Sequence, residues 1–225
     1  IVPGVMYDLS KKHILESVVG ILKRLDMEYL DALVLHRPDA LVEPEEVAAA
    51  FDELEKSGKV RHFGVSNQKP MQIELLKRYV KQPIEIDQLQ LSIPCSNMIT
   101  NGMEVNMASE GAVDRDGSVL DYCRLNDITI QAWSPFQYGF FEGVFIGNEE
   151  KYPKLNAVLN ELADKYNVSP SGIATAWILR HPAEIQMITG STSRKHMQEI
   201  IDGSHVTLTR EEWYRLYLAA DHMLP

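Results

Sequence analysis

The chain has 225 residues, of which 45% are hydrophobic, and its formal net charge is −10 at pH 7. This length suits one large domain or two small ones, and the apolar fraction is ordinary for a globular protein with a core. The acidic balance argues against nucleic acid or an anionic membrane as the main partner.

Helical and extended patterns alternate in the first part of the chain. A helix is predicted from Ser10, because apolar residues recur at helical spacing up to Leu25. The apolar run Asp31–His36 predicts a strand buried on both faces. Pro44 opens a second helix, which Gly58 ends. The next predicted elements are a strand over residues 60–65, a helix over 71–80 and a strand over 84–91.

Two long loops interrupt the second part of the chain. Residues 94–116 are irregular and rich in Asn, Met and Gly, so we expect a loop, with one short helix as an option. Residues 136–152 contain three glycines and predict a second loop. The elements around these loops are a helix over 119–125, a strand over 128–133, amphipathic helices over 155–166 and 171–181, a strand over 185–188, and helices over 194–201 and 210–220.

The alternation of five strands with at least five helices predicts an α/β fold with a parallel sheet and helical crossovers. An open doubly wound sheet and a piece of a (β/α)8 barrel both fit this order. No GxGxxG follows a strand, so a dinucleotide fold of that type has no support. No repeat or linker divides the chain, and we expect residues 1–225 to form a single domain.

The cysteines and the chain start indicate the cellular setting. Cys95 and Cys123 form no CxxC pair, and we expect free thiols in a reducing, cytoplasmic compartment. No apolar run of about 18 residues exists, so no membrane span is expected. The first four residues resemble no signal peptide and lack an initiator Met, which predicts a cropped or processed chain.

Polar or stacking groups follow all five predicted strands. In parallel α/β folds, ligands bind beyond the carboxyl ends of the strands. Any one of these groups has an ordinary structural explanation, such as a helix cap or a core aromatic ring. Together they predict one polar ring around a pocket. The groups are His36, Ser66-Asn67, Gln88 with Gln90, Trp133-Ser134 and Thr189-Gly190-Ser191.

Four of these strand ends carry specific motifs. They are LVLHRPD over residues 33–39, EKSGKVRHFGVSN over 55–67, DQLQL over 87–91 and AWSPF over 132–136. In order and spacing they resemble the aldo-keto reductase superfamily, and the resemblance runs from Tyr7 to the end. It implies a (β/α)8 TIM barrel of which this chain holds about strands 4–8, with the N-terminal part of the barrel missing from it.

The resemblance implies an NADP-dependent oxidoreductase that reduces small aldehydes or ketones by hydride transfer without a metal. The family's catalytic tetrad is Asp, Tyr, Lys and His. His36 matches the catalytic His, whose role is to orient the substrate carbonyl. Trp133 matches the aromatic ring that stacks on the nicotinamide. The residues that match the carboxamide-binding positions are Ser66, Asn67 and Gln88.

Further positions match the rest of the cofactor site. Ser134, Pro135, Phe136 and Gln137 match the stretch along the pyrophosphate. Gly190 and Ser191 match the site of the adenosine 2′-phosphate, and Glu199 matches an acid that contacts adenine. Gly190 stands where the family often has a basic residue, and His196 stands where it has Arg. We still expect NADP(H) rather than NAD(H), because Arg194 or Lys195 could reach a 2′-phosphate.

The sequence departs from the family at three of the four tetrad positions. The family's Asp, Tyr and Lys precede the matched segment, and Tyr7, Lys11 and Lys12 have the wrong context to replace them. Without the Tyr and Lys there is no placed proton donor. Two functional hypotheses therefore remain: a carbonyl reductase, or a catalytically silent nucleotide-binding protein that regulates or scaffolds a partner. A different parallel α/β fold with coincidental motifs is the third alternative.

Overall fold

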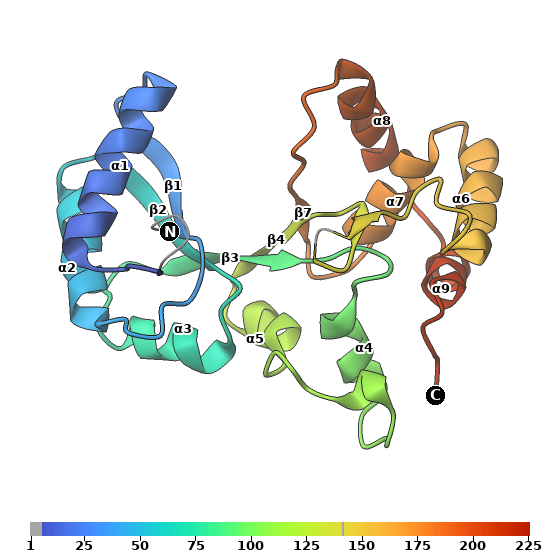
Figure 1. Cartoon of the computed structure of the whole chain (residues 1–225), viewed down its shortest axis with the longest axis horizontal. Helices are drawn as coiled ribbons and strands as arrows, with labels where there is room; N and C mark the ends of the chain where they lie inside the picture. The colour runs from blue at the N-terminus through green and yellow to red at the C-terminus, as the bar shows by residue number, and fades with distance from the viewer. Residues whose placement is uncertain (1–5, 141) are drawn as a thin grey trace. The chain divides into compact units, whose positions relative to one another are not determined.

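The computed structural model describes residues 6–140 and 142–225 of the chain. Five parallel strands hydrogen-bond in the order β1-β2-β3-β4-β7, which confirms the predicted α/β class (Figure 1). The chain divides into two compact units. Unit 1 comprises Ile1–Gln88 and Asp121–Thr129, and unit 2 comprises Leu89–Leu120 and Ile130–Pro225.

Unit 1 is built from helices and strands that alternate, as predicted. Ser10 caps the first helix by accepting a hydrogen bond from the backbone N–H of His13, and Pro44 begins the second helix. Gly58 turns the chain toward the second strand at a φ of 70°. The elements are α1 (Lys11–Leu25), β1 (Leu30–Leu35), α2 (Pro44–Lys56), β2 (Val60–Ser66), α3 (Pro70–Lys77), β3 (Ile84–Gln90, whose last two residues belong to unit 2) and α5 (Val119–Leu125, whose first two residues belong to unit 2).

The register of β1, β2 and β3 brings their carboxyl ends level. Leu35 pairs with Val65, and Ser66 pairs with Gln88. Gly64 lets β2 approach β3 closely, since a Cβ there would lie 2.7 Å from the Cβ of Ile86. The polar residues that follow these strands therefore lie at one edge of the sheet.

The prediction that β1 is buried on both faces is wrong. Leu30 and Leu35 are buried, but Asp31 and Ala32 are exposed. The reason is the place of β1 in the sheet: it lies at the end of the strand order, and β2 is its one strand neighbour there among the described residues. The two strands that pair with β2 cover it better, and only Arg61 and His62 of β2 are exposed.

Unit 2 packs its helices around buried aromatic rings. Trp177 and Trp213 stack with ring centroids 4.7 Å apart, and Tyr217 continues the stack. Helix α7 is buried from Gly172 to Ile178 rather than amphipathic as predicted, because it lies in contact with α6 and α8. The elements are α4 (Asn97–Met103), a 3-10 turn (Glu110–Ala112), β4 (Thr129–Trp133, which begins in unit 1), β5 (Gln137–Tyr138), β6 (Gly143–Val144), α6 (Pro153–Tyr166), α7 (Pro170–Leu179), β7 (Gln186–Met187), α8 (Arg194–Ser204) and α9 (Arg210–Ala219).

The two predicted loops contain short regular elements. The loop over 94–116 holds α4 and the 3-10 turn, in line with the optional short helix. The loop over 136–152 holds an antiparallel hairpin in which Gln137 pairs with Val144. The sequence did not predict this hairpin, because strands of two residues are too short to show an alternating pattern.

Candidate functional site

The carboxyl ends of β1, β2 and β3 bring four predicted residues of unit 1 to one edge. His36 follows β1 directly, and Ser66 and Gln88 are register partners. The Ser66 hydroxyl donates to the backbone oxygen of Gln88 at 2.9 Å, and the Asn67 backbone N–H donates to the same oxygen at 3.0 Å. The Asn67 side-chain amide donates to the Ser66 hydroxyl at 2.7 Å.

This hydrogen-bond network fixes the backbone of the turn after β2. Asn67 has a φ of 55°, in the left-handed region, where Asn is among the residues best tolerated. Ser66 is buried and Asn67 is half-buried. The turn therefore holds one polar side chain in place at the sheet edge and leaves the other accessible to a ligand.

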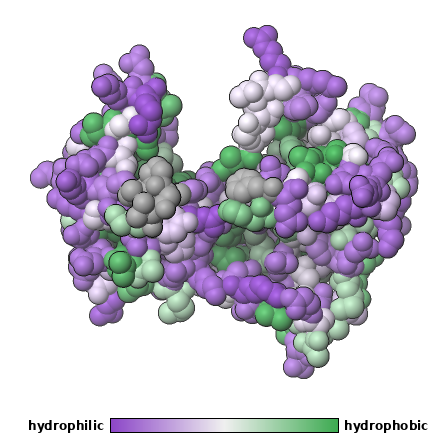
Figure 2. Space-filling view, viewed as in Figure 1, coloured by the Kyte–Doolittle hydropathy of each residue, from purple (hydrophilic) through white to green (hydrophobic). Residues whose placement is uncertain are grey.

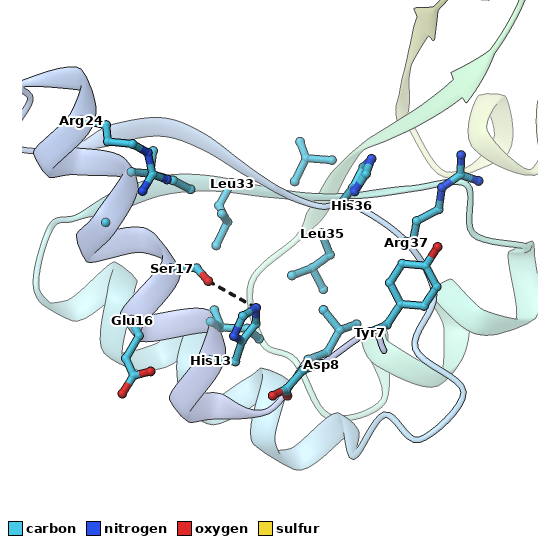
Figure 3. Close-up of a pocket in the computed structure, with 15 residues that line it drawn as sticks. Tyr7, Asp8, His13, Glu16, Ser17, Arg24, Leu33, Leu35, His36 and Arg37 are labelled. Carbon is cyan, nitrogen blue, oxygen red and sulfur yellow. Dashed lines mark hydrogen bonds between the residues drawn. The ribbon is translucent and has the colours of Figure 1, made fainter. Parts of the chain in front are cut away.

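His36 is exposed at the end of β1 (Figure 3). Desolvation and the neighbouring Arg37 charge lower the pKa of its imidazole, so the ring is neutral at pH 7. His36 and Arg37 also border a groove of about 370 Å³ within unit 1, between β1 and α1. On the α1 side of this groove, the Ser17 hydroxyl lies 3.4 Å from the His13 ring (Figure 3).

Unit 2 contains a second pocket, of about 690 Å³, which is in the range of small-molecule sites. It combines aromatic and aliphatic side chains with hydroxyl groups from three strand or helix ends. Its lining residues are Trp133, Ser134, Pro135, Phe136, Gln137, Val144, Ile146, Ser171, Ile188, Thr189, Gly190, Ser191, His196 and Ile200.

Most cofactor residues expected in unit 2 line this one pocket. The structure brings together the stretch 133–137, Gly190, Ser191 and His196. Arg194 and Glu199 lie on α8 but outside the lining, and Lys195 Nζ lies 3.9 Å from Glu199 Oε1. Sequence reasoning missed Val144 and Ile146, which come with the hairpin, and Ser171 and Ile200, which are on α7 and α8. Their spacing indicated only helices or loop.

Local turns shape the two polar ends of the pocket. Ser134 has a φ of 52°, and its carbonyl accepts the Gln137 backbone N–H at 3.1 Å. At the other end, the Ser193 hydroxyl caps α8, and the Ser191 hydroxyl accepts the Ser193 backbone N–H at 3.2 Å. The N-terminus of α8 therefore points its partial positive charge toward the Gly190-Ser191 side, which favours an anion there.

The hairpin that borders the pocket is tied down on two sides. The buried Asn156 side chain bonds the backbone of Phe145, Gly147, Asn148 and Tyr152 at 2.6–3.1 Å. On the other side, Gln90 donates to the Gly139 carbonyl at 2.7 Å. These contacts explain why a loop without predicted structure forms a pocket wall.

Three further findings concern the surface, membrane-spanning helices and metal-binding groups. On the face shown in Figure 2, hydrophilic residues cover most of the surface, and apolar residues form small groups. Within residues 6–140 and 142–225, no helix is long and apolar enough to cross a membrane. In the same described part, no three His, Cys, Asp or Glu residues gather in a way that could hold a metal ion.

Curated relatives match the chain over most of its length. An uncharacterized oxidoreductase of Bacillus subtilis, YcsN, is 35% identical over 95% of this chain and 65% of its own length. A 6-dehydroglucose reductase of Agrobacterium fabrum is 31% identical with the same coverage. The chain thus spans about 65% of the length of these relatives.

Solved structures agree on the fold. The thermostable aldo-keto reductase Tm1743, in complex with the inhibitor epalrestat, aligns with a TM-score of 0.72 and 26% identity, over 94% of this chain and 67% of that one. A Bombyx mori aldo-keto reductase in complex with NADP aligns with a TM-score of 0.68 and 19% identity, over 96% of this chain and 66% of that one. The profile of the Aldo/keto reductase family matches residues 2–219. The chain is therefore a partial (β/α)8 barrel that belongs to the aldo/keto reductase family of oxidoreductases.

Proposed function

We propose that this chain is the nucleotide-binding part of an NADP(H)-dependent oxidoreductase that reduces small aldehydes or ketones to alcohols. The observation that carries the proposal is the pocket of unit 2, because the stretch 133–137, Gly190, Ser191 and His196 all line it. When bound, NADPH supplies the hydride.

The residues of the pocket fit a dinucleotide phosphate. Ser134, Thr189 and Ser191 offer hydroxyl groups, and the N-terminus of α8 favours negative charge. Arg194 and Lys195 lie exposed in the first turn of α8, where a cation could meet a 2′-phosphate. Trp133 offers an aromatic face in the same pocket.

Unit 1 would orient the reacting groups. Asn67 and Gln88 carry side-chain amides at the sheet edge, which suit the amide of a nicotinamide ring. His36 is neutral at pH 7, so its ring can donate one hydrogen bond to a carbonyl oxygen without carrying charge. Such groups position a substrate.

We also propose that the complete enzyme contains three further βα units before this segment. They would supply the Asp, Tyr and Lys that the family's tetrad needs, and this chain would supply His36. The supporting observation is that about one third of the length of the relatives and aligned structures lies outside the part that this chain matches. The cytoplasm is the proposed location, because Cys95 and Cys123 are free thiols.

The alternative is a catalytically silent protein that binds nucleotide and regulates or scaffolds a partner. Both hypotheses need the pocket of unit 2, but only the reductase needs a proton donor for the substrate. Turnover therefore separates them, and nucleotide binding does not.

The first test is titration of the 225-residue chain with NADPH and NADH, monitored by fluorescence and calorimetry. We expect NADPH to bind at least tenfold more tightly, because the 2′-phosphate adds a charge-assisted contact of roughly 1.5–3 kcal/mol. Lys195→Gln should reduce this preference, whereas Lys59→Gln, on unit 1, should leave it unchanged. No binding of either nucleotide would overturn the proposed cofactor role.

The second test follows NADPH oxidation with a simple aldehyde, for this chain and for a version extended at its N-terminus to the length of the relatives. Turnover by the extended protein, lost in His36→Gln, supports the reductase. Tight NADPH binding without turnover in the extended protein would instead favour the regulatory or scaffold role.

A further inference from the structure

Asp87 is a buried carboxyl group directly behind the turn that carries Ser66 and Asn67. Its exposed fraction is 0%, and it lies on β3 next to Gln88 and opposite Val65 of β2. Because successive side chains of a strand point to opposite faces, Asp87 points away from the face that Gln88 presents. It therefore lies on the covered face of the sheet.

The carboxyl group of Asp87 has an unusual environment. The backbone amides of Gln68 and Asn67 lie near enough to lower its pKa. Yet no described residue offers either oxygen a donor within 3.5 Å at a hydrogen-bonding angle. The two amides therefore attract the carboxyl group without forming a hydrogen bond to it within 3.5 Å.

Among the described residues, no basic side chain contributes to the pKa of Asp87. Cys123 of α5 interacts with it, and burial together with the Asp87 charge raises the pKa of that thiol to about 12, so the thiol is neutral. Tyr122 is the next group on α5, and its hydroxyl donates to Glu74 of α3. Burial raises the pKa of Asp87 to about 7. The carboxyl group therefore changes charge in the neutral range.

We propose that Asp87 is a positioning residue that sets the backbone of the Ser66–Asn67 turn from behind, through the amides of Asn67 and Gln68. When the carboxyl group is neutral, the Asn67 N–H stays on the Gln88 carbonyl at 3.0 Å. When it is ionised, it draws the two amides toward itself, because an anion is a stronger acceptor than a neutral carbonyl.

A change in the backbone of the turn also affects its accessible side chain, that of Asn67. The Asn67 side-chain amide donates to the Ser66 hydroxyl at 2.7 Å, so a backbone rotation at Asn67 changes where that amide points. This step rests on the proposed function, in which Asn67 binds the nicotinamide carboxamide. We expect ionised Asp87 to weaken NADPH binding several-fold, and by reciprocity bound NADPH to raise the midpoint of Asp87 titration.

The experiment is an NMR titration of the 225-residue chain between pH 5 and 9. It follows the Asp87 carboxyl carbon and the amide nitrogens of Asn67 and Gln68. We expect all three to share one midpoint, and we expect the amide steps to vanish in Asp87→Asn, which has nearly the same shape. His62→Asn is the matched control, because His62 is an exposed side chain of β2 that pairs with Glu85 of β3, and the three signals should be unchanged in it.

The outcomes separate the two proposals. Amide steps that persist in Asp87→Asn, or an Asp87 titration in wild type with no amide response, would overturn the positioning role. NADPH affinity is measured in parallel, and it should lose its pH step in Asp87→Asn. If the chain binds no NADPH at any pH, the proposed function fails, and the amide titration still decides the role of Asp87 by itself.

Discussion

Two buried carboxyl groups, one in each unit, have opposite environments. In unit 1, two backbone amides lie near Asp87, but no described donor forms a hydrogen bond with it within 3.5 Å, and burial raises its pKa to about 7. In unit 2, Glu212 is also buried, and burial by itself would raise its pKa. Lys165, the Thr209 backbone N–H and the Tyr166 hydroxyl donate to it and lower its pKa to about 2. Donors rather than depth decide whether a buried acid is charged.

The candidate sites of the two units also differ. Unit 2 forms its pocket from its own residues, with hydroxyls and a helix N-terminus that suit an anion. Unit 1 instead presents side chains at strand ends, with His36 exposed. The two units therefore offer different kinds of site, one a pocket and the other an open edge of the sheet.

The largest effect is expected in the aromatic core of unit 2. The Trp177 and Trp213 rings stack at an angle of 8°, and each indole N–H donates to the backbone oxygen of the other residue at 3.0–3.1 Å. Trp213→Ala removes the stack and one donor, and should lower the free energy of unfolding by about 3–5 kcal/mol. Urea denaturation measures this. Trp213→Phe keeps a ring and should cost less, and equal costs would contradict the role of the stack.

The second effect tests the unpaired acid of unit 1. Because Asp87 binds its proton more tightly when folded, stability falls as pH rises from its ordinary pKa of 3.8 to about 7 and then stays reduced. Asp87→Asn removes this penalty, which is worth up to about 4 kcal/mol at pH 8. The gain should shrink toward pH 5.

Urea denaturation of the wild-type chain and of Asp87→Asn, each at pH 5 and pH 8, checks this prediction. His62→Asn serves again as control, since His62 is exposed and pairs with Glu85 at 3.0 Å. It should change stability by less than about 1 kcal/mol. A gain from Asp87→Asn that is equal at both pH values would contradict the assigned pKa.

The third effect concerns the contact between α7 and α8. A Cβ on Gly203 would lie 2.3 Å from the backbone oxygen of Gly172, so Gly203→Ala must push α8 away. Overpacking of this kind costs about 1–3 kcal/mol. Because His196 and Ile200 of α8 line the pocket, NADPH affinity should fall as well.

Gly102→Ala is the matched control for Gly203→Ala. Gly102 lies in α4 of the same unit, and a Cβ there would meet no atom within 4 Å. Alanine should be neutral or stabilise by up to about 1 kcal/mol, with NADPH affinity unchanged. Equal losses in both variants would show that the α7–α8 contact is not the cause.

The sequence predicted the strands and the strand-end residues well because their signals are local. Apolar runs fixed β1 to β4, and the motifs around His36, Asn67, Gln88 and Trp133 lie at strand ends as expected. The exposure of Asp31 and Ala32 was not predictable from the run itself, because it depends on which strands pair with β1.

The unpredicted part of the candidate site depends on contacts between distant residues. The hairpin wall with Val144 and Ile146 is held by Asn156 and Gln90, and neither carries a local signal for that role. The sequence places Asp87 in a predicted strand but does not show that its side chain is buried. That burial depends on the pairing of β3 with β2, which puts Asp87 opposite Val65. Charge state, likewise, depends on which donors the fold brings near.

The smallest effect tests the well-paired acid of unit 2. The folded-state pKa of Glu212 is about 2, against 4.5 ordinarily, so its stabilisation is complete above pH 4.5 and is lost as pH falls toward 2. Glu212→Gln should therefore cost about 1–2 kcal/mol at pH 7, less than the pKa difference alone implies, because Lys165 is more than half exposed. Denaturation at pH 7 and pH 3 should show that the loss of stability in Glu212→Gln becomes smaller in acid. The effect of Asp87→Asn also becomes smaller in acid, but it has the opposite sign, because that substitution stabilises the protein. A cost that does not change with pH would mean that Glu212 acts through its capping hydrogen bond to Thr209, which Gln can keep, rather than through its charge.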